Sequence, residues 1–525
     1  MAKDAPAAIG TWGGCLLPNG KAEFGIWAPG QQHMTLRIAG REQRMEPRAD
    51  GWFTLEVQNA VAGSEYMFLR ADGMAVPDPA ARVQGGDVHG PSLLVDPESY
   101  RWQAADWRGR PWEEAVIYEL HIGTFTAEGT FRAAIDQLDH LAGIGVTAIE
   151  IMPVAQFAGT RGWGYDGTYL YTPHSAYGSP DDFKALIDAA HGKGLMVILD
   201  VVYNHFGPEG NYLAAYAPAF FHPERHTPWG AAIAYEKPPV RAFIIENALY
   251  WLKEYRLDGL RLDAIDHIHD EDSPEHILIE MARRIRAEIT DRPVHLTTED
   301  NRNITDLHER ADDGTAPLYT AEWNDDFHNV AHAVATGETD AYYADFAEGH
   351  WRKFARALAE GFAFQGEETA KGEKRGSSCA HLPPTAFVDF LQNHDQIGNR
   401  AFGERLVDLA GEGTVRALTA ILLLSPHIPL LFMGEEWGET RPFAFFTDFQ
   451  GKLADAVREG RRKEFAQFAA FRDPARRTSI PDPNAPATFE ASKIDWQRRD
   501  SEEGRAWLSF YRDLLQIRRT EIVPR

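Results

Sequence analysis

The feature that most constrains this chain is a regular alternation of strand-like and helix-like segments between about residues 114 and 433. Eight short apolar runs have the length and composition of buried parallel strands. These runs are 116–120, 146–152, 195–202, 259–264, 294–298, 319–321, 387–391 and 428–433. Apolar residues at helical spacing lie between them, as in Phe183, Leu186 and Ile187. Eight strands with intervening helices predict an α/β fold, the (β/α)8 TIM barrel.

Three regions are predicted along the chain. Residues 1–100 contain short alternating runs broken by Gly, Pro, Asn and Asp, which predict an N-terminal β-sandwich of a carbohydrate-binding type. Residues 101–450 hold the barrel, and the long loop 203–239 after its third strand is expected to form a small subdomain. Residues 451–525 are expected to form a C-terminal helical segment that ends in a helix over 506–520.

Charge and cysteine content exclude several classes of protein. The chain has 78 acidic and 53 basic residues and a formal net charge of −25, which repels phosphate backbones and anionic lipids, so we expect neither a nucleic-acid nor a membrane partner. Cys15 and Cys379 are the only cysteines, which leaves no disulfide framework and no zinc cluster. Residues 1–11 lack the pattern of a signal peptide, and no apolar stretch is long enough to span a bilayer. The sequence therefore predicts a cytoplasmic protein.

Carboxylates stand at the ends of three predicted strands, where TIM barrels place catalytic groups. They are Asp263, Glu299 and Asp395. A glycosidase needs a carboxylate nucleophile and a protonated carboxyl, and a third carboxylate can bind sugar hydroxyls as the ring distorts. Arg261 shares a strand face with Asp263 and favours an ionised nucleophile. Glu299 follows an uncharged strand, which suits an acid whose pKa is raised by desolvation.

One motif points to a different chemistry. Residues 162–167 satisfy the G-x-G-x-x-G spacing of dinucleotide sites. Such a site needs the glycines at a turn from a strand into a helix, but an extended aromatic run over 168–172 follows here, with Pro173 next. We therefore expect no nicotinamide or flavin, and no other cofactor.

The strand-end motifs resemble those of the α-amylase superfamily, glycoside hydrolase family 13. The match lies in residues 200–205, 259–263, 299 and 393–395. Within this superfamily the sequence most resembles the maltooligosyltrehalose trehalohydrolases. The narrower match lies in residues 119–126, 161–167, 201–212, 322–328, 390–400 and 431–438, and its most family-specific strings are FGPEG at 206–210 and WNDDFH at 323–328.

The resemblance implies hydrolysis of an α-1,4-glucan at the bond next to a terminal trehalosyl unit, with release of trehalose and retention of configuration. By motif position, Asp263 is the nucleophile, Glu299 the general acid/base and Asp395 the stabiliser of the transition state. An enzyme that forms the trehalosyl end is the implied functional partner. The family usually has an antiparallel β domain after the barrel. This sequence ends in a predicted helix instead, so either that domain is absent or the sequence is truncated.

The resemblance also implies residues that bind the substrate. Tyr165 would stack on the sugar being cleaved, and His205, Arg261 and His394 would bind its hydroxyls and the nucleophile. On the side of the leaving trehalose the implied residues are Asp266, His267, Trp323, Asn324, Asp325, Asp326, His328, Gln396 and Asn399. Asp266 and His267 replace the Lys-His pair of many relatives, which fits a trehalose end better than a plain glucan.

Aromatic side chains stack on sugar faces, but most of them pack in protein cores. Of Tyr203, Trp229 and Trp323, we expect only Trp323 to stack on glucose. Asn204 occupies a position where related amylases often have a calcium ligand. Its loop adds only Glu209 as a carboxylate, so no required metal is expected.

Two alternatives to the trehalose-releasing hydrolase remain open. A glucan branching or debranching enzyme shares the sandwich-and-barrel plan but would not be expected to have the strings at 206–210 and 323–328. A non-catalytic glucan-binding protein would be expected to have lost at least one of the three carboxylates.

Overall fold

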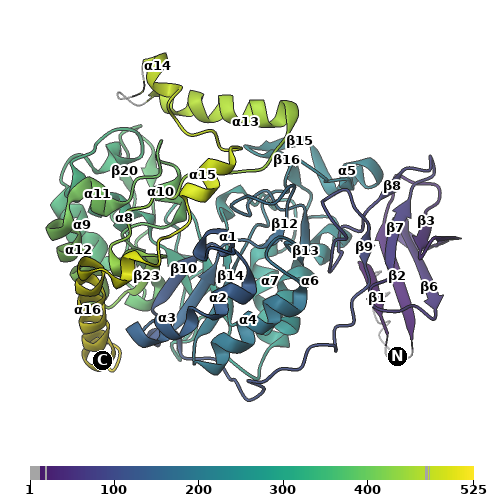
Figure 1. Cartoon of the computed structure of the whole chain (residues 1–525), viewed down its shortest axis with the longest axis horizontal. Helices are drawn as coiled ribbons and strands as arrows, with labels where there is room; N and C mark the ends of the chain where they lie inside the picture. Colours follow the sequence, from purple (N-terminus) through teal and green to yellow (C-terminus); the bar gives the residue numbers. More distant parts are fainter. Residues whose placement is uncertain (1–11, 18–19, 468–470, 472) are drawn as a thin grey trace.

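Eight parallel strands close into a barrel in the computed structural model, which describes residues 12–17, 20–467, 471 and 473–525 (Figure 1). In barrel order they are β10 (Ile117–Leu120), β11 (Ala148–Ile151), β14 (Met196–Val201), β17 (Gly259–Leu262), β18 (His295–Thr298), β19 (Ala321–Trp323), β22 (Phe387–Phe390) and β23 (Ile428–Phe432). Every residue in these strands is buried, as expected for strands with side chains inside and helices outside. The predicted (β/α)8 barrel is confirmed.

The sixth strand differs from its predicted position at 319–321. It covers Ala321–Trp323, because Ala321 and Glu322 are the residues that pair with Thr297 and Thr298 of β18. The hydroxyl of Tyr319 instead donates a hydrogen bond to the carbonyl of Leu278 in a neighbouring helix.

Helices surround the barrel. After β10 come α1 (Ile122–Phe125), α2 (Phe131–Ile135) and α3 (Leu138–Ile144); the later main helices are α4 (Pro180–Gly192), α6 (Pro238–Glu254), α7 (Ile277–Glu288), α8 (Asp325–Thr336), α9 (His350–Glu360), α10 (His394–Gly398), α11 (Leu406–Ala410), α12 (Glu412–Leu424) and α16 (Glu502–Ile517). The last helix, α16, packs against α12 and α3, so it closes the ring of helices after β23. The predicted C-terminal segment is therefore in part an element of the barrel.

The N-terminal region consists of two antiparallel sheets, as predicted. One has the order β1 (Gly13–Leu16), β2 (Lys21–Trp27), β6 (Trp52–Gln58), β5 (Glu46–Pro47); the other contains β3 (Thr35–Ile38), β4 (Arg41–Arg44), β7 (Glu65–Leu69), β8 (Ala75–Val76) and β9 (Ser92–Leu93). Trp12 packs edge-on against Phe220 and Phe243, and its indole donates to the carbonyl of Pro239 at 2.9 Å. The sandwich thus supports the loop 203–239.

Two further segments lie near the carboxyl ends of the strands. The loop 203–239 carries α5 (Leu213–Tyr216) and a hairpin of β15 (Phe221–Thr227) and β16 (Gly230–Ile233). The chain after the barrel forms α13 (Gly451–Glu464), α14 (Pro474–Arg477) and α15 (Pro486–Ala491), with α13 and α14 at the top of the view in Figure 1.

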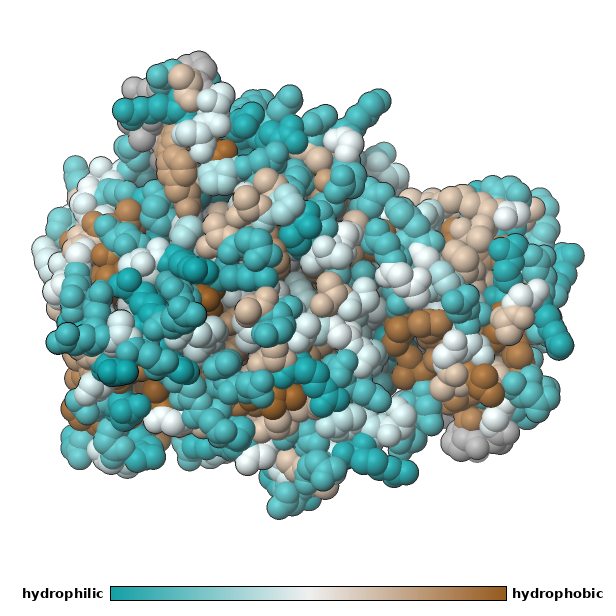
Figure 2. Space-filling view, in the orientation of Figure 1, coloured by the Kyte–Doolittle hydropathy of each residue, from teal (hydrophilic) through white to brown (hydrophobic). Residues whose placement is uncertain are grey.

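The surface agrees with the composition. The face in Figure 2 is mostly hydrophilic over the barrel, as expected with 25% charged residues. No helix among the described residues is long and apolar enough to cross a lipid bilayer. The stretch 1–11, which lacks a signal-peptide pattern, lies outside the described residues. Residues 162–167 lead into β13 (Tyr169–Pro173), so the extended run predicted after these glycines is confirmed.

Candidate active site

Three carboxylates converge on the guanidinium of Arg261, whose side chain rises from β17 into the mouth of the barrel. Its Nη1 donates to Asp200 Oδ2 at 2.7 Å and to Asp263 Oδ1 at 3.1 Å. Its Nη2 donates to Glu299 Oε2 at 2.5 Å. Arg261 is only 1% exposed, so these ion pairs offset the cost of burying its charge. Arg261, Asp263 and Glu299 therefore lie together at the mouth of the barrel, as their places at the strand ends predict.

Asp263 and Glu299 lie close enough for one sugar bond to reach both. They contact the two terminal nitrogens of the same guanidinium. Two carboxyls held beside each other at the mouth of a barrel are what a glycosidase needs, one to act on the anomeric carbon and one to protonate the leaving oxygen. Ala264 has a left-handed backbone (φ 39°), and its N–H donates to Glu299 Oε2 at 3.1 Å. That turn holds the second carboxyl against the first, and strain of this kind is common at active sites.

Asp263 and Glu299 have different protonation states, because their environments shift their pKa values by different amounts. Burial raises the pKa of Glu299 to about 8; the Arg261 guanidinium opposes the rise, and the charges of Asp263 and Asp395 add to it. Burial raises the pKa of Asp263 to about 6, again against the effect of Arg261. Arg261 does favour the ionised form of Asp263, as predicted, but burial has the larger effect. At neutral pH Asp263 is mostly ionised and Glu299 mostly protonated, which is the division that a glycosidase needs.

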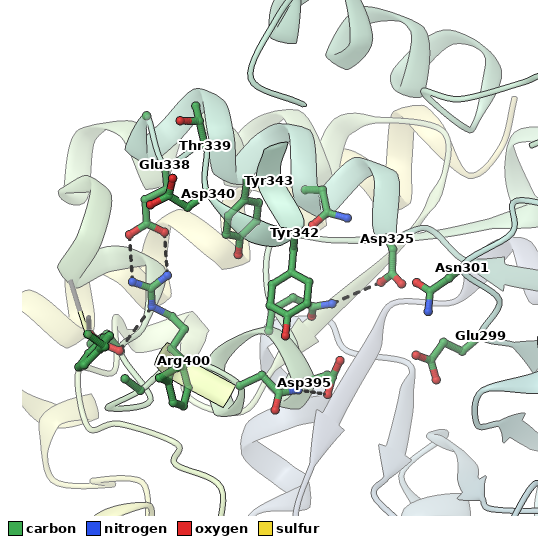
Figure 3. Close-up of a pocket in the computed structure, with 18 residues that line it drawn as sticks. Glu299, Asn301, Asp325, Glu338, Thr339, Asp340, Tyr342, Tyr343, Asp395 and Arg400 are labelled. Carbon is green, nitrogen blue, oxygen red and sulfur yellow. Dashed lines mark hydrogen bonds and ion pairs between the residues drawn. The ribbon is translucent and has the colours of Figure 1, made fainter. Parts of the chain in front are cut away.

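Asp395 lies in α10, the short helix that begins directly after β22 and its loop. Its backbone N–H bonds to the side chain of Asn393, which caps the helix. Its Oδ1 accepts a hydrogen bond from Asn399 Nδ2 at 2.5 Å. Asp395 is half-buried and lines a cavity together with Glu299 (Figure 3). The third predicted carboxylate therefore faces the same space as the second.

Tyr165 and His394 form one wall of the site. The Tyr165 hydroxyl donates to Asp200 Oδ2 at 2.6 Å, and its ring stacks on the imidazole of His394 at 5.1 Å. His394 Nδ1 lies 2.5 Å from Glu119 Oε1. Burial lowers the pKa of this histidine, but the charge and hydrogen bond of Glu119, with the charge of Asp395, together outweigh burial and raise it. Glu119 and Asp200 were not among the predicted site residues, although both lie in the matched motifs. They hold the ring and the imidazole in place.

His205, His267 and Trp229 form a second group. His205 Nδ1 lies 2.6 Å from Asn204 Oδ1 and its Nε2 lies 2.9 Å from the carbonyl oxygen of Tyr165. Burial lowers the pKa of His205 to about 4. The indole of Trp229 stacks on His205 at 4.5 Å and meets His267 edge-on at 5.0 Å.

The prediction that Trp229 packs in the core is wrong, because the hairpin β15–β16 holds it at the surface and 47% of it is exposed. The same prediction for Tyr203, which is 1% exposed, is confirmed. Asp266 lies beside His267, with Oδ2 3.9 Å from the imidazole Nε2.

Beyond Glu299 and Asp395 lies a cavity of about 520 Å³ (Figure 3). Part of its wall comes from the predicted residues Asp325, Gln396 and Asn399. Gln396 Nε2 donates to Asp325 Oδ1 at 3.3 Å. Burial, with the charges of Glu299 and Asp395, raises the pKa of Asp325 to about 7.

Three segments that sequence reasoning missed supply most of the remaining cavity wall. They are the turn 337–343 after α8, residues 400–404 after α10, and Phe465 with Phe471 from the chain after the barrel. Figure 3 places Tyr342 between Asp325 and the ion pair of Glu338 with Arg400. Apart from Arg400, which ends the matched string 390–400, no motif in the sequence marks these residues.

Four predicted binding residues are instead buried parts of the framework. The ring of Trp323 is 2% exposed and lies under the Arg261 guanidinium at 4.1 Å, so it cannot stack on a sugar. Asn324 caps α8 and donates to Asp389. Asp326 pairs with Arg375 and accepts from Asn303, and His328 bonds to the carbonyl of Leu391. The string 323–328 runs from the end of β19 into the first turn of α8, and the barrel covers the inner face of this helix. Of the residues in this string, only Asp325 lines the cavity.

No metal centre stands out in the described part of the chain, where no three His, Cys, Asp or Glu side chains are grouped to hold an ion. The side chain of Asn204 is engaged elsewhere: its Nδ2 donates to Asp263 Oδ2 at 3.1 Å, and its Oδ1 contacts His205. This asparagine therefore acts as a link between the nucleophile candidate and His205.

Comparison with known proteins agrees with this fold and site. Residues 97–218 and 221–523 match the family described as the alpha amylase catalytic domain. Together, the barrel and its carboxylates define a glycosidase of the α-amylase family.

Closer relatives narrow the class. A malto-oligosyltrehalose trehalohydrolase from Deinococcus radiodurans is 43% identical over 97% of this chain and 82% of its own length. One from Saccharolobus solfataricus is 41% identical over 94% of this chain and 85% of its own. A solved structure of a putative alpha amylase from Salmonella typhimurium superposes with a TM-score of 0.95 at 62% identity and covers 98% of this chain and 87% of that one. Within the α-amylase family the chain belongs to the malto-oligosyltrehalose trehalohydrolases.

Proposed function

We propose that this glycosidase cleaves the α-1,4-glucosidic bond next to the terminal trehalosyl unit of maltooligosyltrehalose and releases trehalose. The main support for this proposal is that the pair of catalytic carboxyls lies next to a cavity large enough for a disaccharide. Asp263 and Glu299 share one guanidinium, and a cavity of about 520 Å³ opens directly beside Glu299 and Asp395. Sequence similarity to malto-oligosyltrehalose trehalohydrolases over nearly the whole chain supports the same reaction.

The chemistry follows from the protonation states. Ionised Asp263 attacks the anomeric carbon, while protonated Glu299 gives its proton to the leaving glycosidic oxygen. The products of this step are a covalent glucosyl ester on Asp263 and free trehalose. Glu299, now ionised, takes a proton from water, and the water breaks the ester. Two inversions at the same carbon retain the α configuration.

Asp395 and the Tyr165–His394 wall act on the sugar that carries the reacting carbon. Tyr165 offers a ring face to this sugar. Its hydroxyl lies beside Asp200 and Arg261, whose polar groups can bind hydroxyls of the sugar. Asp395 accepts hydroxyl hydrogen bonds that strengthen as the ring distorts and gains positive charge.

The cavity holds the leaving trehalosyl unit. Its volume lies within the range of about 300–1,000 Å³ that is usual for small-molecule sites. Its lining combines ring faces, in Tyr342 and Phe465, with polar groups that can bind hydroxyls, in Glu338, Arg400 and Asp325. Sugar sites use this combination of apolar faces and directed hydrogen bonds.

We further propose a functional link to an enzyme that forms the trehalosyl end, and a cytoplasmic location. The first is supported by the proposed substrate, which such an enzyme must supply. The second is supported by the free thiols of Cys15 and Cys379, which persist in reducing compartments.

Product analysis tests the proposed function. The protein is incubated with maltopentaosyltrehalose, and products are separated by chromatography. We expect trehalose and maltopentaose in equal amounts, with the new reducing end first appearing as the α anomer by NMR. Release of glucose or maltose in place of trehalose, or the appearance of new α-1,6 linkages, would refute the proposal in favour of another α-amylase-family enzyme.

A further inference from the structure

Arg461, a buried arginine outside the barrel motifs, is connected to Asp395 through the side chain of Asn399. Arg461 lies near the end of α13, which crosses above α10 in Figure 1. Its Nη1 donates to Asn399 Oδ1 at 3.1 Å. Asn399 Nδ2 donates in turn to Asp395 Oδ1 at 2.5 Å. The chain of contacts therefore runs from the segment after the barrel to the carboxylate that faces the cavity.

The chemistry of these groups fixes the direction of the chain. A guanidinium has donors only and an ionised carboxylate has acceptors only. Because Asn399 lies between them, its oxygen must face Arg461 and its amide nitrogen must face Asp395. Among the described residues, Arg461 is the group that donates to the Asn399 oxygen. Without the arginine, the amide can turn and present its oxygen to the carboxylate of Asp395.

Arg461 also holds the backbone that carries this asparagine. Its Nη2 donates to the carbonyls of Gly398 and Arg400, on either side of Asn399. The guanidinium lies over the rings of Phe445 and Phe465, at 5.4 and 4.7 Å. Arg461 is 7% exposed, so these hydrogen bonds form away from competing water. Phe465 also lines the cavity, which ties this anchor to the wall of the site.

We propose that Arg461 is a positioning residue for catalysis: through Asn399 and the turn around it, Arg461 sets the orientation of Asp395. The inference rests on the proposed function for the role of Asp395, but not on the identity of the leaving group. It assigns part of the catalytic apparatus to α13, a helix outside the barrel ring, and predicts that this helix affects turnover more than substrate affinity.

Arg461→Met tests the proposal, because methionine keeps an unbranched apolar stem but has no donors. Misplacement of a catalytic group costs on the order of tenfold to a hundredfold, so we expect kcat to fall at least about tenfold while KM changes less than about threefold. Arg461→Lys, which can restore a single hydrogen bond, should recover part of the loss. Arg458→Met is the matched control: Arg458 lies on the same helix and pairs with Asp455 and Asp482, away from the site, so its kcat should be unchanged.

A double-mutant cycle with Asn399→Ala separates positioning from general destabilisation. If the two residues act in one chain, the double variant loses no more kcat than the worse single variant. Wild-type kcat in Arg461→Met, or losses in kcat that multiply in the double variant, would overturn the proposal. A lower melting temperature with kcat intact would also overturn it. Each variant is assayed on maltopentaosyltrehalose and on plain maltoheptaose, so that failure of wild-type enzyme to release trehalose would count against the proposed function and leave the cycle interpretable.

Discussion

The two sides of the proposed cleavage point come from different parts of the chain and are built differently. On the catalytic side, Asp263 and Glu299 directly follow barrel strands and share a buried guanidinium. On the other side, much of the cavity wall comes from the turn 337–343, residues 400–404 and Phe465, none of which belongs to a strand. The reaction chemistry therefore depends mainly on the barrel framework, and the choice of leaving group depends on segments outside its strands.

The largest expected effect lies on the catalytic side. Glu299→Gln keeps the size of the side chain but removes its transferable proton. We expect kcat to fall by about 10³-fold or more on both trehalosyl and plain glucans, with glucan binding retained. Steady-state kinetics and calorimetric binding measure the two quantities. Glu275→Gln, an exposed residue paired with Arg283, should match wild type. Unchanged turnover in Glu299→Gln would remove Glu299 from the role of acid.

The pH dependence tests the same pair without a mutation. Protonation of Asp263 removes the nucleophile, so kcat/KM should fall as pH drops below about 6. Loss of the proton from Glu299 removes the acid, so kcat/KM should also fall as pH rises above about 8. Initial rates at low substrate between pH 4 and about 10 give the profile. A rate that stays constant through the upper limb would contradict the assignment of a buried, protonated Glu299.

The cavity side should show a selective effect. Tyr342 is 55% exposed and stands in the cavity, so Tyr342→Ala removes a ring face without opening the core. We expect kcat/KM for the trehalosyl substrate to fall about tenfold, equivalent to about 1.4 kcal/mol, and that for the plain glucan to change less than about twofold. An equal loss on both substrates would place Tyr342 on the catalytic side instead.

The smallest effect is expected at Trp229. Trp229→Ala removes an exposed ring stacked on His205 and should raise KM a few-fold, on the order of 1 kcal/mol, with kcat nearly constant.

The buried tryptophan, Trp323, offers the contrast. Trp323→Ala should destabilise the fold by about 3–5 kcal/mol, seen as a lower melting temperature. If Trp323→Ala folded as wild type and only its KM rose, Trp323 would be a binding residue after all.

Sequence reasoning located the catalytic side because two kinds of signal coincide there. Strand-like apolar runs mark the barrel, and the polar residues that end those runs must meet at one face. Asp263 and Glu299 meet at this face, as expected. Their catalytic roles remain predictions. The N-terminal sandwich was equally visible, since alternation and turn residues mark each short strand.

The cavity side was harder to predict, because its determinants are tertiary. The string 323–328 is distinctive, yet two of its residues do not face the cavity. Trp323 is buried in the barrel, and Asp326 is buried in an ion pair with Arg375. Conversely, the position of Trp229 depends on a hairpin whose direction no local pattern shows. Arg461 lies in a charged helix whose sequence indicates a solvent-exposed element. Its contact with Asn399 depends on how this helix packs, which the sequence pattern does not show.

A competition assay tests the central claim most directly, namely that a barrel with general glycosidase chemistry is made selective by the cavity beside it. Equal concentrations of maltopentaosyltrehalose and maltoheptaose are mixed with the enzyme, and the disappearance of each is followed by chromatography. We expect the trehalosyl substrate to be consumed at least about tenfold faster, with trehalose as the product. Equal rates of consumption would contradict it, because the cavity would then not distinguish a trehalosyl end from a plain one.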